Sequence, residues 1–169
     1  MLWWLRNLCY ERGLEHDFLA ELITYEGSLN ERTGQFFTPE PAARLMVEMM
    51  GIPEQLKAAE EEDRTVSIAE PSCGTGTFVV AVYASCIRKG IDFRRAHWFC
   101  IDIDRAAAAA CAFNCLIRGI NAEVVHGDGL RQKWFSVWTV KYDDKRREVL
   151  IKNSTPQRSK IETKALKGQ

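Results

Sequence analysis

The chain has 169 residues, of which 46% are hydrophobic and 27% are charged, values typical of one water-soluble globular domain. It has no apolar run near the roughly 18 residues of a membrane span and no basic region before its apolar N-terminus, so we expect a cytoplasmic protein without membrane contact. Residues 1–130 hold 12 Lys and Arg against 19 Asp and Glu, whereas residues 131–169 hold 11 against 4. This basic C-terminal fifth predicts either contact with DNA phosphates or a solvated tail.

Helical signals dominate the N-terminal part of the chain. Apolar residues recur at helical spacing over 2–25, with an interruption at Gly13, and indicate two short helices. A loop is expected over 26–35. A proline directly after Thr38 predicts that this residue caps a further helix, which would end at Gly51.

The pattern then alternates between strand and helix. Two helices are expected, one over 77–89 and one that Asp104 caps and Gly119 ends. Repeated β-α-β units require parallel strands joined by right-handed crossovers, so we predict an α/β fold with a short parallel sheet and helices on both faces. The predicted strands of this sheet are 65–70, 97–103 and 122–126.

The C-terminal part departs from this alternation. Bulky and small side chains alternate over 134–142, a polar turn follows, and 148–152 is a second β-type run, which together predict an antiparallel hairpin. The first strand of the sheet would otherwise expose its edge. We expect either the hairpin or a second copy of the chain to cover that edge.

These signals predict one domain in four consecutive segments. A helical segment comes first, an α/β core that binds the ligand follows, and the hairpin and a basic tail complete the chain. The segments are 1–33, 34–130, 131–153 and 154–169.

Cysteine and histidine lack the spacing of a metal site. The six cysteines are scattered through apolar segments, which favours buried reduced thiols over disulfides. Cys111 and Cys115 would share one helix face, but no further metal-binding pattern accompanies them. We therefore expect no metal, and the three isolated histidines receive no catalytic role.

Ligand-binding features gather where the predicted strands end. Gly74 and Gly76 lie between the first strand and the following helix, where glycine lets the backbone approach a ligand closely. The third glycine of a dinucleotide fingerprint and the lysine of a Walker motif are missing from this stretch. Acidic residues end the three strands, namely Glu70, Asp102 and Asp128. Such carboxylates suit a ligand that offers an amine, a ribose diol and an adenine amino group, although a single acid there is more often merely solvated.

Four motifs in this order resemble those of a known family. Residues 34–39 read GQFFTP, residues 70–76 read EPSCGTG, residues 102–104 read DID and residues 126–130 read HGDGL. Together they resemble the modification (methylase) subunits of type I restriction-modification systems, which are adenine-N6 DNA methyltransferases. The resemblance covers about residues 17–130.

The resemblance implies a truncated Rossmann-like methyltransferase fold with S-adenosylmethionine as cofactor. Glu70 and the turn over 72–76 would hold the methionine end, Asp102 the ribose hydroxyls and Asp128 the adenine amino group. Two residues of the preceding loop, Phe37 and Thr38, would cover the ligand. The implied cofactor-binding residues are Phe37, Thr38, Glu70, Ser72, Cys73, Gly74, Thr75, Gly76, Asp102, Ile103, Asp128 and Leu130.

The catalytic motif of that family is missing from this sequence. The family positions the target adenine with an Asn/Asp-Pro-Pro-aromatic loop after its fourth strand. The nearest candidate here is Asn153-Ser154-Thr155-Pro156, which lacks the second proline and the aromatic residue. Two functions stay open: an adenine-N6 DNA methyltransferase that is active only with a partner subunit or through an unusual loop, or a noncatalytic cofactor-binding or restriction-modulating pseudo-enzyme. Methylation of a protein glutamine would need the same tetrapeptide.

Overall fold

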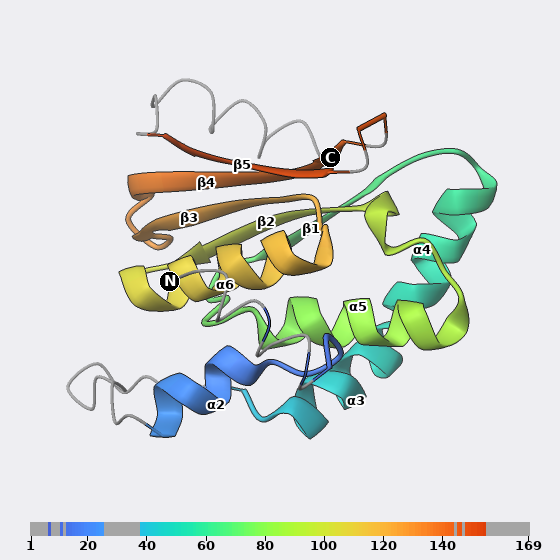
Figure 1. The fold of residues 1–169 in the computed structure, drawn as a ribbon, viewed down its shortest axis with the longest axis horizontal. Helices are drawn as coiled ribbons and strands as arrows, with labels where there is room; N and C mark the ends of the chain where they lie inside the picture. Colours follow the sequence, from blue (N-terminus) through green and yellow to red (C-terminus); the bar gives the residue numbers. More distant parts are fainter. Residues whose placement is uncertain are drawn as a thin grey trace.

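The computed structural model confirms an α/β fold and describes residues 7, 11, 13–25, 38–143, 145–146 and 148–154. Figure 1 shows one sheet with helices packed beside it. The strands are β1 (Val66–Glu70), β2 (Ala96–Asp102), β3 (Ala122–Asp128), β4 (Lys133–Asp143) and β5 (Glu148–Ser154). The helices are α2 (Phe18–Tyr25), α3 (Glu40–Met50), α4 (Ile52–Glu61), α5 (Thr77–Lys89), the short 3-10 helix η2 (Phe93–Arg95) and α6 (Arg105–Arg118). Within the described ranges, no helix has the length and apolarity that crossing a membrane requires.

The sheet follows the order β1-β2-β3-β4-β5, so each strand lies beside the next one in the chain. The first three strands are parallel, as predicted, with Glu70 opposite Cys100 and Asp102 opposite His126. Since parallel strands end at the same edge of a sheet, the carboxyl ends of β1, β2 and β3 meet there.

The described helices gather on one face of the sheet rather than on both. The main hydrophobic cluster joins residues of α3, α4, α5 and α6 to strand residues such as Trp98 and Val124. The cluster on the opposite face, around Ile101, Val125 and Val137, consists of strand residues alone. Both crossovers move the chain in the same direction along the sheet, and right-handed crossovers of that kind put their helices on the same side.

The predicted hairpin exists, but the expectation that it covers β1 was wrong. β4 pairs antiparallel with β3, with Val125 opposite Val137, and β5 pairs with β4. Only four residues separate β3 from β4, and so short a connection favours a neighbouring antiparallel strand over a crossing to the far edge. Among the described residues, β1 therefore pairs with β2 alone.

Two helix predictions needed correction. Thr38 does not cap α3, because Pro39 occupies the position before the helix and no side chain caps it. Helix α4 lies between the helix predicted to end at Gly51 and the first predicted strand, where the sequence analysis predicted no element. Its apolar side chains Ile52, Leu56 and Ala59 recur at helical spacing and are buried, while charged residues cover the outer side. The first of the two expected N-terminal helices falls almost entirely outside the described residues.

Candidate functional site

The turn after β1 is shaped by the acid that ends β2. Asp102 is only 8% exposed, and its two carboxylate oxygens accept hydrogen bonds from the backbone N–H groups of Gly74 and Asp104, both at 2.8 Å. The backbone N–H of Cys73 donates to the carbonyl of Ile101 at 2.9 Å. The turn is thus tied to the end of β2 at two points, the Asp102 side chain and the neighbouring Ile101 carbonyl.

Glycine is required within this turn by conformation and by space. Gly74 has φ of +53° and Gly76 has φ of +89°, both in the left-handed region that side chains disfavour. A Cβ atom at Gly76 would also lie 2.9 Å from the Cys111 sulfur. Helix α6 therefore packs directly against the backbone of the turn.

Glu70, at the end of β1, is half-buried and ionises with difficulty. Burial, and secondarily the nearby Cys73, raises the pKa of its carboxyl from 4.5 to about 7. A carboxyl that is partly protonated near neutral pH releases a proton when a cationic partner approaches.

The turn after β3 comes close to the turn after β1. A Cβ atom at Gly129 would lie 3.6 Å from the carbonyl oxygen of Pro71, and it would also contact Ile101. Asp128 accepts a hydrogen bond from the backbone N–H of Arg131 at 2.9 Å. Two of the predicted motifs, EPSCGTG and HGDGL, thus adjoin at the same edge of the sheet.

Two apolar side chains stand exposed at this edge. Ile103, just after β2, is 63% exposed, and Leu130, two residues after Asp128, is fully exposed. Large apolar side chains in such positions are the kind of surface that a ring-bearing ligand would cover.

A buried polar network supports the turn from the N-terminal side. Asp17 is 3% exposed and accepts hydrogen bonds from the hydroxyls of Thr75 at 2.6 Å and Thr77 at 2.8 Å, and from the Asn114 side-chain amide at 2.8 Å. Arg118 continues the network by donating to the Asn114 carboxamide oxygen at 2.8 Å. The sequence analysis did not identify Asp17, Asn114 and Arg118. An acid directly before a helix, such as Asp17, is usually interpreted as a helix cap, and nothing in the sequence links Asp17 to Asn114.

Four cysteines surround the base of the turn. Cys73, Cys100, Cys111 and Cys115 are all buried and unbridged. Cys100 and Cys111 hydrogen-bond the Cys73 sulfur, which lowers the pKa of the Cys73 thiol relative to theirs. In the part of the chain that the structure describes, no three His, Cys, Asp or Glu side chains are arranged to hold a metal ion.

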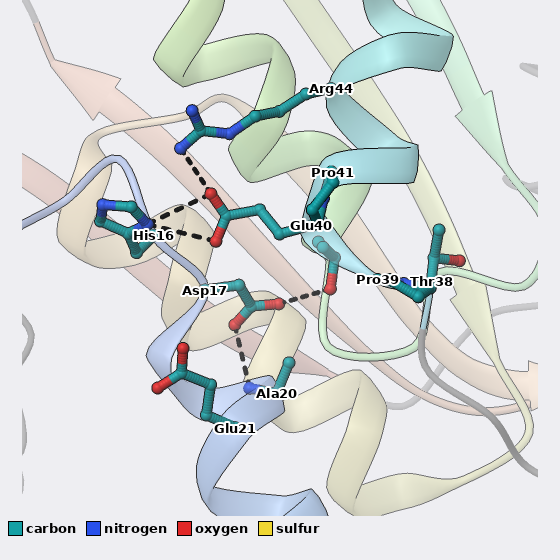
Figure 2. A pocket seen from close by; sticks show the side chains of 10 residues that line it. His16, Asp17, Ala20, Glu21, Thr38, Pro39, Glu40, Pro41 and Arg44 are labelled. Carbon is teal, nitrogen blue, oxygen red and sulfur yellow. Dashed lines mark hydrogen bonds and ion pairs between the residues drawn. The ribbon is translucent and has the colours of Figure 1, made fainter.

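A pocket of about 940 Å³ is lined by Asp17 and Thr77 of the buried polar network and by residues of α2 and the start of α3. Figure 2 shows the Glu40 carboxylate held between His16 and Arg44, with Asp17 below them. Of the predicted cofactor-binding residues that the structure describes, only Thr38 lines this pocket. Asp17 lines the pocket and also contacts the turn after β1. That turn lies at the strand-end edge, the edge of the sheet where β1, β2 and β3 end.

The remaining predicted residues lie as follows. Ser72 is exposed at the start of the turn, and Phe37 falls outside the described residues. The candidate catalytic residue Asn153 lies within β5, paired opposite Trp138 and exposed. The strand order puts β5 at the opposite side of the sheet from β1, so Asn153 is separated from Glu70 by the width of the sheet.

These features define an α/β protein whose turns and acids converge where three parallel strands end. The sequence profile described as N-6 DNA Methylase matches residues 18–165, and the chain belongs to this family. The methylase subunit of the type I restriction enzyme MjaIX from Methanocaldococcus jannaschii is 27% identical over 125 residues, which are 74% of this chain and 20% of that protein. The chain thus spans about a fifth of the length of this curated relative. No solved structure matches the chain.

Proposed function

We propose that the strand-end edge binds S-adenosylmethionine. The observation that carries this proposal is the convergence of Glu70, Asp102 and Asp128 around two glycine-containing turns. Each Asp102 oxygen accepts one backbone hydrogen bond and keeps a second lone pair, which suits the paired hydroxyls of a ribose.

The other parts of the ligand find partners of matching chemistry at the same edge. Glu70 would pair with the methionine ammonium, and Asp128 would accept from the adenine amino group. The exposed side chains of Ile103 and Leu130 would cover the adenine ring.

We infer that the chain is an adenine-N6 DNA methyltransferase-like protein with an incomplete catalytic site. Bound S-adenosylmethionine supplies an electrophilic methyl group, but transfer also needs residues that hold the target amino group in line with it. Asn153 sits in a paired edge strand, far across the sheet from Glu70, which disfavours it for that role. This favours the second candidate function, a noncatalytic cofactor-binding module that acts with a restriction-modification partner.

DNA is the proposed nucleic-acid partner, and the basic C-terminal part is the proposed contact. Arg131, Lys133, Lys141 and Lys152 are exposed on β4, β5 and the turn before them, and Lys133 lies 5.6 Å from the centre of the Phe135 ring. Exposed cations beside an aromatic ring suit phosphate and base contacts. Such binding should weaken steeply as salt concentration rises.

The test pairs calorimetric titration with S-adenosylmethionine and transfer of labelled methyl to unmethylated DNA. We expect the wild-type chain to bind the cofactor and Asp102→Ala to bind it at least about tenfold more weakly, as expected for loss of hydrogen bonds to a charged group. Asp102→Asn, which keeps one acceptor oxygen, should lie between them. Glu61→Ala, which changes an exposed acid on α4, is the matched control.

The outcomes separate the candidate functions. Binding without methyl transfer would support the noncatalytic module, and binding with transfer would support the enzyme. If transfer occurs, Asn153→Ala then asks whether that residue contributes. A wild-type protein that does not bind, with Asp102→Ala behaving identically, would remove the cofactor assignment.

A further inference from the structure

Asp17 is the most deeply buried acid among the described residues, and it makes no ion pair shorter than 4 Å there. An ionised carboxylate in such a place is costly unless hydrogen bonds satisfy it. Here both oxygens are satisfied by neutral donors: Oδ2 by the hydroxyls of Thr75 and Thr77, and Oδ1 by the Asn114 side chain and the Ala20 backbone N–H. Charge-assisted hydrogen bonds of this kind are strong and directional.

The donors bracket Gly76 in the turn over 73–77. Thr75 and Thr77 flank Gly76, which holds a left-handed φ of +89°. Asn114 also donates to the Thr75 carbonyl at 2.9 Å. Thr75 is therefore held through both its side chain and its backbone. One carboxylate therefore restrains three consecutive residues, Thr75, Gly76 and Thr77.

The restraint comes from far away in the sequence. Asp17 lies 58 residues before Thr75 and 97 before Asn114. Its own segment is anchored by Arg118, which donates to the carbonyls of Leu14 at 2.7 Å and His16 at 2.8 Å. The N-terminal segment is thus docked onto α6 and delivers Asp17 to the turn.

We propose that Asp17 is a positioning residue, which holds the turn over 73–77 in its ligand-binding conformation through the hydroxyls of Thr75 and Thr77. This inference rests on the proposed cofactor function of that turn. A turn that is ordered beforehand spares the ligand the entropic cost of ordering it, so loss of the restraint weakens binding without removing any ligand contact.

The first measurement follows backbone amide exchange in the protein without ligand. Asp17→Asn keeps the size of the side chain but puts an amide donor where four donors converge. We expect exchange of the amides in the turn to accelerate at least about tenfold, while amides of β2 and β3 keep their wild-type rates. A role limited to overall stability would accelerate all of them together, and unchanged exchange in the turn would overturn the inference.

The second measurement is S-adenosylmethionine affinity at temperatures where every variant is folded. Asp17→Asn and Thr77→Val should each bind about tenfold more weakly, whereas Thr77→Ser should bind like wild type because it keeps the hydroxyl. The double variant Asp17→Asn/Thr77→Val should lose less affinity than the product of the two single losses. Glu21→Gln, which changes an exposed acid on α2 just after this segment, should bind like wild type. Full additivity, or failure of Thr77→Ser to bind like wild type, would overturn the inference.

The two measurements distinguish this inference from the proposed function. If wild type does not bind the cofactor, the proposed function fails. The exchange experiment still decides on its own whether Asp17 orders the turn.

Discussion

Glu70 gives the proposed site a pH dependence with a definite sign. Its carboxyl has a pKa of about 7 in the folded chain, against 4.5 without burial. An ammonium partner favours the ionised form, so binding releases a proton. We expect affinity for S-adenosylmethionine to rise between about pH 6 and pH 8, measured by calorimetry in buffers of different ionisation enthalpy.

The Glu70→Gln variant is the control for this pH dependence. It should bind S-adenosylmethionine more weakly at pH 8 and lose most of the pH dependence. An affinity that falls as pH rises from about 6 to 8 would contradict the assignment of Glu70.

The same raised pKa acts on stability in the opposite direction. Because the folded chain holds the proton more tightly, the free energy of unfolding falls as pH rises from 4.5 to about 7.

Gly76 is the residue of the turn that tolerates substitution least. Gly76→Ala combines a left-handed φ of +89° with a Cβ atom 2.9 Å from the Cys111 sulfur. We expect it to destabilise the protein by about 1–2 kcal/mol from the backbone alone and by more from the clash. Urea denaturation measures this.

Replacement of the facing side chain tests the cause. In Gly76→Ala/Cys111→Ala the sulfur is gone but the backbone strain remains, so part of the loss should be recovered. Cys86→Ala, a buried cysteine on α5 that the Gly76 Cβ would not contact, should give no such recovery.

At this scale, the sequence was informative about residues that act through local pattern. Gly74 and Gly76 stood between a strand and a helix, and Asp102 followed an apolar strand, so their places were predictable. Asp17 and Asn114 meet only because the segment before α2 docks against α6, and no spacing rule connects residues 97 positions apart. The roles assigned to the predicted residues await the experiments above.

Among the elements, α6 carries the most connections to the site, since Cys111, Asn114 and Arg118 all lie on it. Its N-terminus is capped by Asp104, whose side chain accepts from the Ala107 backbone N–H at 2.8 Å, as the sequence predicted. We expect Asp104→Ala to lower the free energy of unfolding by about 1 kcal/mol, and Asp104→Asn by much less. Equal effects of both variants in thermal or urea unfolding would contradict a capping role.

The elements also show where sequence patterns mislead. The helices α5 and α6 were predicted because their apolar residues are nearly continuous, whereas the hairpin was predicted from the alternation over 134–142. Helix α4 was missed because charged residues interrupt its four buried residues, Ile52, Pro53, Leu56 and Ala59. The partner of the hairpin was misjudged because the alternation over 134–142 tells which side chains face the core, but not which strand lies alongside.

The whole molecule has an unpaired strand edge at β1 within its described part. Ser67 and Ala69 are exposed on that short strand, and unpaired edges attract further strands. We expect concentration-dependent self-association in sedimentation experiments and its loss in Ser67→Lys. Leu150→Lys, on the opposite edge strand β5, should leave self-association intact. Self-association that is lost in Leu150→Lys but kept in Ser67→Lys would show that the chains associate through β5 instead.

The strand order has a consequence for how the molecule is made. Because each strand pairs with the one synthesised just before it, the sheet can grow strand by strand as the chain leaves the ribosome, closing only short loops. The contacts from Asp17 to Asn114 and from Leu14 to Arg118 span 97 and 104 residues, and they wait until α6 exists. The turn over 73–77 is therefore translated early, yet it gains its final support only after more than forty further residues have been added.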